Sequence, residues 1–189
     1  MLRSGAQPPP RAGIQVIKIT VAKTAAGWVG LAFSASGLAE LHYPLPERGP
    51  ALAALQTRFP EAMVLVDHAW ARLKAQLRDY FDGQPIAFEA PLDVASYTPF
   101  RRAVWEATSR IAYGETRTYA WVAREVGVPR AYRAVGAALG ANPIPIIIPC
   151  HRVLRSNGGL GGYGGGLALK QRLLAMEKGI AITAVQELD

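Results

Sequence analysis

The 189-residue sequence predicts an α+β fold in two domains. Three apolar runs, the first of which alternates with polar residues, predict a small N-terminal domain with a three-stranded antiparallel sheet plus helices. From Thr98 onward helical periodicity dominates, which predicts a mainly helical, winged-helix-like C-terminal domain with a helix-turn-helix. We expect a flexible tail over residues 1–13, the N-terminal domain over 14–92 and the C-terminal domain over 93–189.

The net charge of +7 is divided unevenly. Residues 1–96 hold nine basic against eight acidic side chains, whereas residues 97–189 hold twelve against six. A basic excess is compatible with an ordinary basic protein or with attraction to a polyanion such as nucleic acid. The C-terminal domain is therefore where a polyanion would bind.

The single cysteine, Cys150, limits the chemistry of the chain. It excludes an intramolecular disulfide and a thiolate zinc cage within one chain. We expect no metal and no cofactor. The sequence also contains no apolar run near the roughly 18–20 residues of a membrane span, and its start lacks the apolar core of a signal peptide. These features favour a reducing, cytoplasmic setting.

The N-terminal domain is predicted from period-2 segments and turn residues. Strands are expected over residues 14–23, 28–33 and 38–43, the first half-buried with Lys18 and Thr20 outward. A short helix over 51–58, a longer helix over 64–81 and a short strand over 85–89 are expected to follow. Nothing in this domain suggests chemistry.

Helix start signals organise the C-terminal domain. Thr98 followed by Pro99 predicts a helix up to Gly114, and Thr118 can cap a second helix over 119–126. After a glycine-containing turn, a third helix is expected over 130–140. This spacing is that of a helix-turn-helix, although any helical hairpin can imitate it.

The helix over 130–140 has two different faces. The residues expected to pack on the core are Ala131, Tyr132, Val135, Ala138 and Leu139. The residues expected to point outward are Arg130, Arg133, Ala137 and Gly140. An outward face with cations in the first turn and little bulk afterwards favours close approach to a nucleic acid over an incidental alanine face.

Residues 142–152 present Cys150 after three prolines. Because proline fixes φ and removes a backbone donor, we expect a rigid, extended, buried lead-in to the thiol. A glycine-rich loop over 158–166 follows, which lets backbone N–H groups approach a ligand closely. The arrangement indicates a reactive thiol beside a glycine-lined cavity, with an inert buried cysteine as the plain alternative.

Glu177 falls within the apolar side of a last helix expected over 167–178. A buried carboxylate needs a partner, and His151 or an arginine is expected to supply it. His151 could take the proton of Cys150 directly or through a water, with Glu177 orienting the imidazole. Because neighbouring side chains alternate on an extended segment, the water-mediated route is favoured.

These residues carry a resemblance to a known family. The shared motifs are Thr98-Pro99-Phe100, Tyr113-Gly114-Glu115-Thr116, Tyr119, Arg133-Ala134-Val135-Gly136, Asn142-Pro143, Ile147-Ile148-Pro149-Cys150-His151-Arg152-Val153, Gly161-Gly162-Tyr163-Gly164-Gly165-Gly166-Leu167 and Lys170. Over about residues 90–179 the chain resembles the O6-alkylguanine-DNA alkyltransferases, the methylated-DNA–protein-cysteine methyltransferases of direct DNA repair. The N-terminal domain matches them in size and coarse pattern.

The resemblance implies a single-turnover transfer of an alkyl group from O6-alkylguanine, and from O4-alkylthymine, to Cys150. His151 and Glu177 would generate the thiolate, and Asn142 would help to hold the segment around the site. Tyr119 would give its proton to the guanine ring, and Arg133 would replace the flipped nucleotide in the base stack.

The resemblance also implies the partner, double-stranded DNA bound through the minor groove by a monomer that can act cooperatively. The residues assigned to contact DNA or the flipped base are Tyr119, Arg130, Arg133, Ala134, Ala137, Arg152, Tyr163 and Gly164. Gly164 stands where some members have serine, and Tyr132 is larger than the alanine often found at its position.

Three other functions stay open at this point. An alkylated-DNA sensor would share the fold but lack the cysteine, a cysteine hydrolase would turn over repeatedly, and a winged-helix regulator would bind DNA with sequence preference. Cys150 argues against the sensor.

Overall fold

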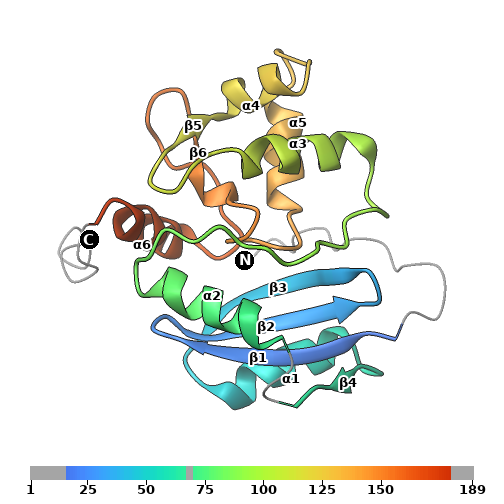
Figure 1. Cartoon of the computed structure of the whole chain (residues 1–189). Helices are drawn as coiled ribbons and strands as arrows, with labels where there is room; N and C mark the ends of the chain where they lie inside the picture. Colours follow the sequence, from blue (N-terminus) through green and yellow to red (C-terminus); the bar gives the residue numbers. More distant parts are fainter. Residues whose placement is uncertain (1–15, 67–69, 180–189) are drawn as a thin grey trace, which may run out of the picture. The chain divides into compact units, whose positions relative to one another are not determined.

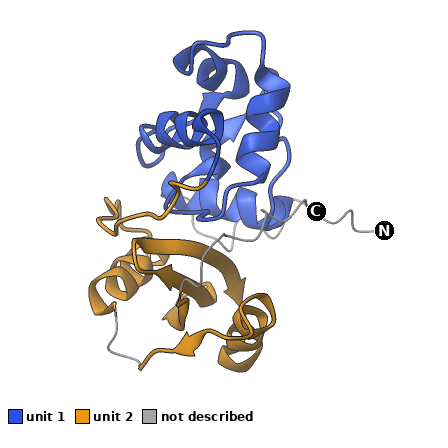
Figure 2. Ribbon diagram, turned by 90° about the vertical axis from the view of Figure 1, so that its right-hand side faces the viewer, with its two compact units in different colours: residues 1–9, 97–189 blue, residues 10–96 orange. Residues whose placement is uncertain are grey.

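The computed structural model describes residues 16–66 and 70–179, which form two compact units that divide between Ser96 and Tyr97 (Figures 1 and 2). The N-terminal unit holds a β-sheet with helices and the C-terminal unit is mainly helical, so the predicted α+β class is confirmed. The tail predicted over residues 1–13 lies outside the described residues. Within the described ranges, no helix has the length and apolar character to cross a bilayer.

The sheet of the N-terminal unit has four strands. Strands β1 (Lys18–Thr24), β2 (Gly27–Ser34) and β3 (Gly37–Leu45) pair antiparallel, as predicted. A fourth strand, β4 (Met63–Val64), pairs parallel with β1 and gives the order β3-β2-β1-β4. The three predicted strands are confirmed, and the fourth was missed because β4 is only two residues long, too short to show a strand period.

Helices cover both faces of this sheet. Helix α1 (Arg48–Arg58) packs on the face that contains Ile19, and α2 (Ala71–Phe81) lies against the other face. Lys74 of α2 donates a hydrogen bond of 2.8 Å to the Thr20 hydroxyl of β1. Thr20 is consequently only 2% exposed, and the prediction of a half-buried first strand is wrong.

Helix α2 begins at Ala71 and not at residue 64. Trp70 precedes it with a φ of 58° and stacks its ring on Phe33, with centroids 4.1 Å apart. This stacking and the pairing of β4 are contacts between distant parts of the chain, which local periodicity does not reveal. The strand predicted over 85–89 is absent from the structure, which describes those residues as irregular.

The C-terminal unit contains four α-helices among the described residues: α3 (Pro99–Ser109), α4 (Tyr119–Glu125), α5 (Tyr132–Gly140) and α6 (Leu167–Glu177). Helices α4 and α5 form the predicted helix-turn-helix, and α3 packs against α5. The buried indole of Trp105 fixes that packing by donating a hydrogen bond of 2.9 Å to the carbonyl of Ala138.

The predicted helix starts depend on two threonine caps. Thr98 accepts a hydrogen bond from the Arg101 N–H, and Thr118 accepts one of 3.1 Å from the Trp121 N–H. Each hydroxyl satisfies a backbone donor that the first turn of a helix leaves open. The starts of α3 and α4 were therefore readable from single residues.

A two-stranded parallel sheet joins α4 to the cysteine segment. Strand β5 (Arg117–Thr118) runs directly into α4, and β6 (Val153–Leu154) follows a single 3₁₀ turn, η1 (Cys150–Arg152). The register pairs Arg117 with Val153 and Thr118 with Leu154. Tyr119 and the cysteine turn are thus attached to adjacent strands.

Candidate functional site

Cys150 begins the η1 turn. The predicted extended segment is therefore wrong at this residue. The chain before it is folded back by hydrogen bonds from the Ile148 N–H to the Ile144 carbonyl and from the Cys150 N–H to the Ile148 carbonyl, at 2.9 and 2.8 Å. Ile146 has a φ of 76°, a left-handed conformation that is strained for a β-branched residue. The prolines predicted an extended segment, but the hydrogen-bonded turns between them fold the chain back on itself.

Asn142 braces this folded segment. Its side-chain oxygen accepts the Ile144 N–H at 3.0 Å, and its amide nitrogen donates to the Ile148 carbonyl at 2.9 Å. The same nitrogen lies 3.2 Å from the Sγ of Cys150. A donor at this position favours the thiolate over the thiol, since it interacts more strongly with the charged form.

Glu177 of α6 is bonded to two residues of the η1 turn. His151 Nε2 lies 2.8 Å from Glu177 Oε1, and both side chains are almost fully buried. Burial by itself raises the pKa of Glu177, but the hydrogen bonds from His151 and Arg152 outweigh it and hold the pKa at about 2. Glu177 is therefore an anion and accepts the Nε2 proton, which leaves Nδ1 as the basic nitrogen of the imidazole.

Arg152 takes a position that its predicted DNA contact does not allow. Its guanidinium donates through Nε and Nη2 to the two oxygens of Glu177 and through Nη1 to the carbonyl of Ile111. The residue is only 8% exposed. Arg152 thus holds the carboxylate in place inside the domain, and the assignment of this side chain to DNA is corrected.

The thiol and imidazole are held in their neutral forms in the resting protein. Burial raises the pKa of the Cys150 thiol, against the hydrogen bond from Asn142 and the positive charge of Lys170, which lower it. Burial lowers the pKa of His151, against the opposing effect of Glu177. The thiolate therefore forms only when the thiol proton is transferred to an acceptor, and it is not the resting form of Cys150.

Lys170 belongs to the site, although in the sequence it appears only among the shared family motifs and has no assigned role. It is fully buried, and its ammonium donates hydrogen bonds to the carbonyls of Val153 and Leu160. Burial lowers its pKa to about 8, and a thiolate at Cys150 would oppose this change. The spacing could have predicted its burial, because Lys170 and Glu177 are two helical turns apart and share one face of α6.

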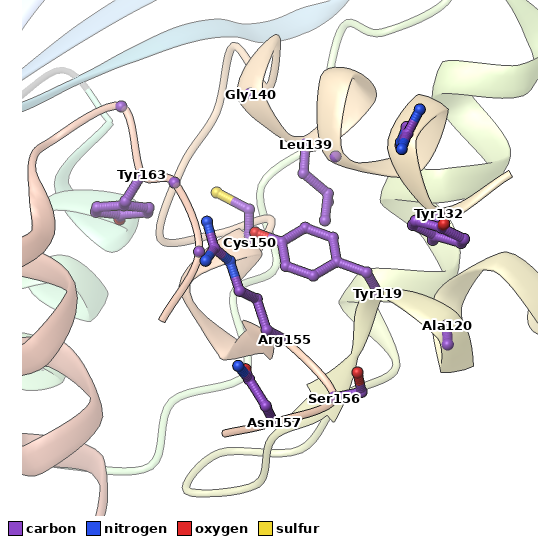
Figure 3. A pocket seen from close by; sticks show the side chains of 15 residues that line it. Tyr119, Ala120, Tyr132, Leu139, Gly140, Cys150, Arg155, Ser156, Asn157 and Tyr163 are labelled. Carbon is purple, nitrogen blue, oxygen red and sulfur yellow. The ribbon is translucent and has the colours of Figure 1, made fainter. Parts of the chain in front are cut away.

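Cys150 opens into a cavity of about 840 Å³. The lining residues are Tyr119, Ala120, Tyr132, Arg133, Gly136, Leu139, Gly140, Cys150, Arg155, Ser156, Asn157, Gly161, Gly162, Tyr163 and Gly164. Figure 3 shows the ring of Tyr119 reaching toward Cys150 across this space. Predicted residues from α4, α5, the η1 turn and the glycine loop therefore meet at one cavity.

Tyr119 lies against glycines on two sides, and only the approach of Gly161 is too close for a side chain. A Cβ on Gly161 would lie 2.5 Å from the Tyr119 hydroxyl, and a Cβ on Gly136 of α5 would lie 3.8 Å from its ring. Burial raises the pKa of Tyr119, and a thiolate at Cys150 would raise it further. The phenol thus stays protonated and can act as a proton donor.

The outward face of α5 is exposed as the helical period predicts. Its exposed residues are Arg133, Ala134, Ala137 and Gly140, with Arg130 in the preceding turn. Only Arg133 and Gly140 of this set also line the cavity. The helix was predicted to begin at Arg130 but begins at Tyr132, so Arg130 lies in the preceding turn.

Tyr132 is not part of the core, contrary to the prediction. Its side chain is 51% exposed, whereas Val135, Ala138 and Leu139 are buried as expected and Ala131 is half-buried. Tyr132 is the first residue of α5, and helical side chains lean toward the N-terminus. Its ring therefore extends past the end of the helix and away from the packed core.

The chain has clear relatives. The family model described as "6-O-methylguanine DNA methyltransferase, DNA binding domain" matches residues 99–179. A methylated-DNA–protein-cysteine methyltransferase of Mycobacterium leprae is 47% identical over 121 residues, which span 64% of this chain and 73% of the relative. One from Mycolicibacterium paratuberculosis is 50% identical over 110 residues, which span 58% of this chain and 66% of the relative.

A solved structure extends the similarity to nearly the whole chain. Mycobacterium tuberculosis OGT in complex with DNA superposes with a TM-score of 0.74 and 36% identity. That superposition covers 89% of this chain and 99% of the other. The similarity thus includes the N-terminal unit, for which the sequence motifs carried little information.

Proposed function

The chain belongs to the methylated-DNA–protein-cysteine methyltransferases, and we propose that it repairs DNA by moving an alkyl group from the O6 of guanine to Cys150. The observation that carries the proposal is the opening of the Cys150 thiol into a cavity that also contains Tyr119 and Arg133. This places a nucleophile, a proton donor and a cation around a space able to hold a base.

The chemistry begins at the thiol. Cys150 gives its proton to His151, through a water, and His151 is oriented to receive it by the hydrogen bond between Nε2 and Glu177. The imidazolium then lies beside an anionic carboxylate, which stabilises its charge. The Asn142 amide and the Lys170 ammonium stabilise the thiolate in the same way.

Transfer exchanges one bond for another. The sulfur attacks the alkyl carbon, a C–S bond forms, and the C–O bond breaks with its electron pair moving into the guanine. Tyr119 donates its proton to the ring so that guanine leaves as a neutral base, and the proton lost by the thiol restores the phenol. A thioether has no leaving group that water could displace, so each chain acts once.

The substrate must leave the duplex to reach the thiol. The cavity is lined by Tyr163 and Gly164 on the side of the glycine loop, and these residues are proposed to hold the flipped base. Arg133, exposed in the first turn of α5, is proposed to take its place in the stack, while Ala134 and Ala137 lie against the minor groove and Arg130 beside the phosphates. O4-alkylthymine presents a similar alkyl oxygen and is proposed as a second substrate.

We propose that the protein binds DNA as a monomer that can act cooperatively, and that it works in the cytoplasm. A thiol that must stay reduced until it is used is suited to a reducing compartment. The basic excess of residues 97–189 supports a polyanionic partner.

Intact-protein mass spectrometry after exposure to a duplex with one O6-methylguanine tests the proposal. We expect one CH₂ added per chain at Cys150, none in Cys150→Ser, and no further turnover with excess DNA. Binding without a mass gain would indicate a sensor and refute the transfer. Repeated turnover on an ester or amide would indicate a hydrolase, and equal binding of a preferred undamaged sequence by Cys150→Ser would indicate a regulator.

A further inference from the structure

Tyr132 is an exposed aromatic side chain at the cavity. It is 51% exposed, and within the described residues its side chain makes no hydrogen bond and no aromatic contact. An exposed ring of this size is not explained by packing, because the core under α5 is completed by Val135, Ala138 and Leu139. Tyr132 therefore has a free ring face on the surface that the proposed function assigns to DNA.

The position of Tyr132 sets it apart from other exposed apolar residues. It lines the same cavity as Cys150, and in Figure 3 it lies on the far side of Tyr119 from the thiol. At about 840 Å³ the cavity is in the upper range of ligand pockets. One base with a small O6 substituent occupies only part of it, so the end beside Tyr132 has room for another group.

The neighbours of Tyr132 decide what that group is. Arg133 follows it directly, and the exposed positions after Arg133 are alanine or glycine. Tyr132 and Arg133 are thus the only long exposed side chains in the described α5. A small-residue face lets the helix approach a duplex closely, and a ring at its leading end then meets the edge or face of a base.

We propose that Tyr132 is a base-stacking residue: its ring packs on a base that flanks the flipped nucleotide, beside Arg133 in the opened stack. This rests on the proposed function and deepens it by assigning a second base subsite. Stacking of an aromatic side chain on a base accepts any base, because each has a π-face. Tyr132 accordingly contributes to holding the duplex open and not to the choice of lesion.

Two substitutions separate the ring from the hydroxyl. Tyr132→Ala removes the ring and Tyr132→Phe keeps it, and Leu167→Ala is the matched control. Leu167 is also the first residue of a helix, is 50% exposed and does not line the cavity. Single-turnover transfer to each variant is measured on methylated duplex and on free O6-benzylguanine.

We expect Tyr132→Ala to slow transfer from the duplex about 5- to 150-fold, the range that corresponds to loss of one base–aromatic stack. Its rate on the free base should stay within twofold of the wild type, and Tyr132→Phe and Leu167→Ala should behave like the wild type on both substrates. Equal losses on duplex and free base would make Tyr132 a wall of the pocket and overturn the proposal. A Phe variant as slow as the Ala variant would also overturn it.

A direct readout of stacking uses 2-aminopurine placed in turn on each side of the lesion. In the complex with wild-type protein we expect its fluorescence to be lower on one side than in the complex with Tyr132→Ala, because stacking quenches it. If the fluorescence is the same with the wild-type protein and with Tyr132→Ala at both positions, the proposed subsite is overturned. The free-base reaction keeps this test distinct from the proposed function, since failure of alkyl transfer itself would abolish that reaction in the wild type.

Discussion

Arg152 holds both oxygens of the Glu177 carboxylate, Nε to Oε2 and Nη2 to Oε1, at 2.9 Å each. Both residues are buried, so water could not solvate either charge if its partner were removed. The pair fixes the carboxylate that orients His151. Structural and chemical roles therefore coincide in one ion pair.

Glu177→Gln should lower the free energy of unfolding by about 3 kcal/mol or more, because it leaves the Arg152 charge buried without its counter-ion. Chemical denaturation measures this change. The matched control is Glu125→Gln, which breaks an exposed pair with Arg110, where side chains are 37% and 51% exposed. The control should cost about 1 kcal/mol or less, and equal losses in the two variants would contradict the structure.

Stability should fall on acidification because of the same carboxyl. Its pKa is about 2 in the folded protein against 4.5 ordinarily, so the unfolded chain binds the proton first as pH falls. About 3 kcal/mol of stability, fully present above pH 5, should be lost between pH 5 and 2. Glu177→Gln should lack this loss, and parallel pH curves for variant and wild type would refute the assignment.

His151 adds a loss of the same sign at higher pH. Its folded pKa is depressed below 6.5 by burial, so the unfolded chain gains a proton that the folded one resists as pH falls through 6.5. The decline of wild-type stability should therefore start near pH 6.5.

Lys170→Met should make Cys150 less reactive at neutral pH. Removing the buried ammonium removes a charge that lowers the pKa of the thiol, so the pH profile of alkylation by iodoacetamide should move to higher pH. A move of one pH unit corresponds to about a tenfold lower rate at pH 7. Lys178→Met, at an exposed lysine after α6, should leave the profile in place. An unfolded chain would react faster, so loss of folding cannot mimic the expected result.

Gly161→Ala should impair transfer and Gly162→Ala should not. A Cβ at Gly161 would lie 2.5 Å from the Tyr119 hydroxyl at a φ of 71°, whereas a Cβ at Gly162 meets nothing within 4 Å. The first variant must displace the proton donor or the loop, and we expect at least a tenfold slower reaction with O6-benzylguanine, about 1.4 kcal/mol. Equal rates for the two variants would show that Tyr119 is not held by this contact.

Arg133→Ala should slow repair of duplex DNA at least tenfold while leaving reaction with the free base within twofold, a loss of about 1.4 kcal/mol in the step that opens the stack. Arg172→Ala removes the same charge from an exposed position on α6 and serves as the control. Rates on both substrates, measured at one salt concentration, give the comparison. An equal loss on duplex and free base would exclude insertion into the stack.

Local signals predicted the helices that begin the C-terminal unit. Thr98 and Thr118 are caps whose effect depends on residues three positions away, so α3 and α4 could be placed from the sequence. The α2 start could not, because Trp70 takes its conformation beside Phe33, far away in the chain. The family motifs gave the site residues, but burial of Arg152 and exposure of Tyr132 depend on packing that no motif records.

The short parallel sheet of β5 and β6 sets the distance between the proton donor and the nucleophile. Tyr119 follows β5 directly and Cys150 begins the turn that leads into β6, so two paired positions set how far the phenol stands from the sulfur. A slip of one residue would shift one group by about 3.3 Å along the strand. An inserted residue between β5 and Tyr119, or between Cys150 and β6, should therefore separate the phenol from the sulfur and slow transfer even where the domain still folds.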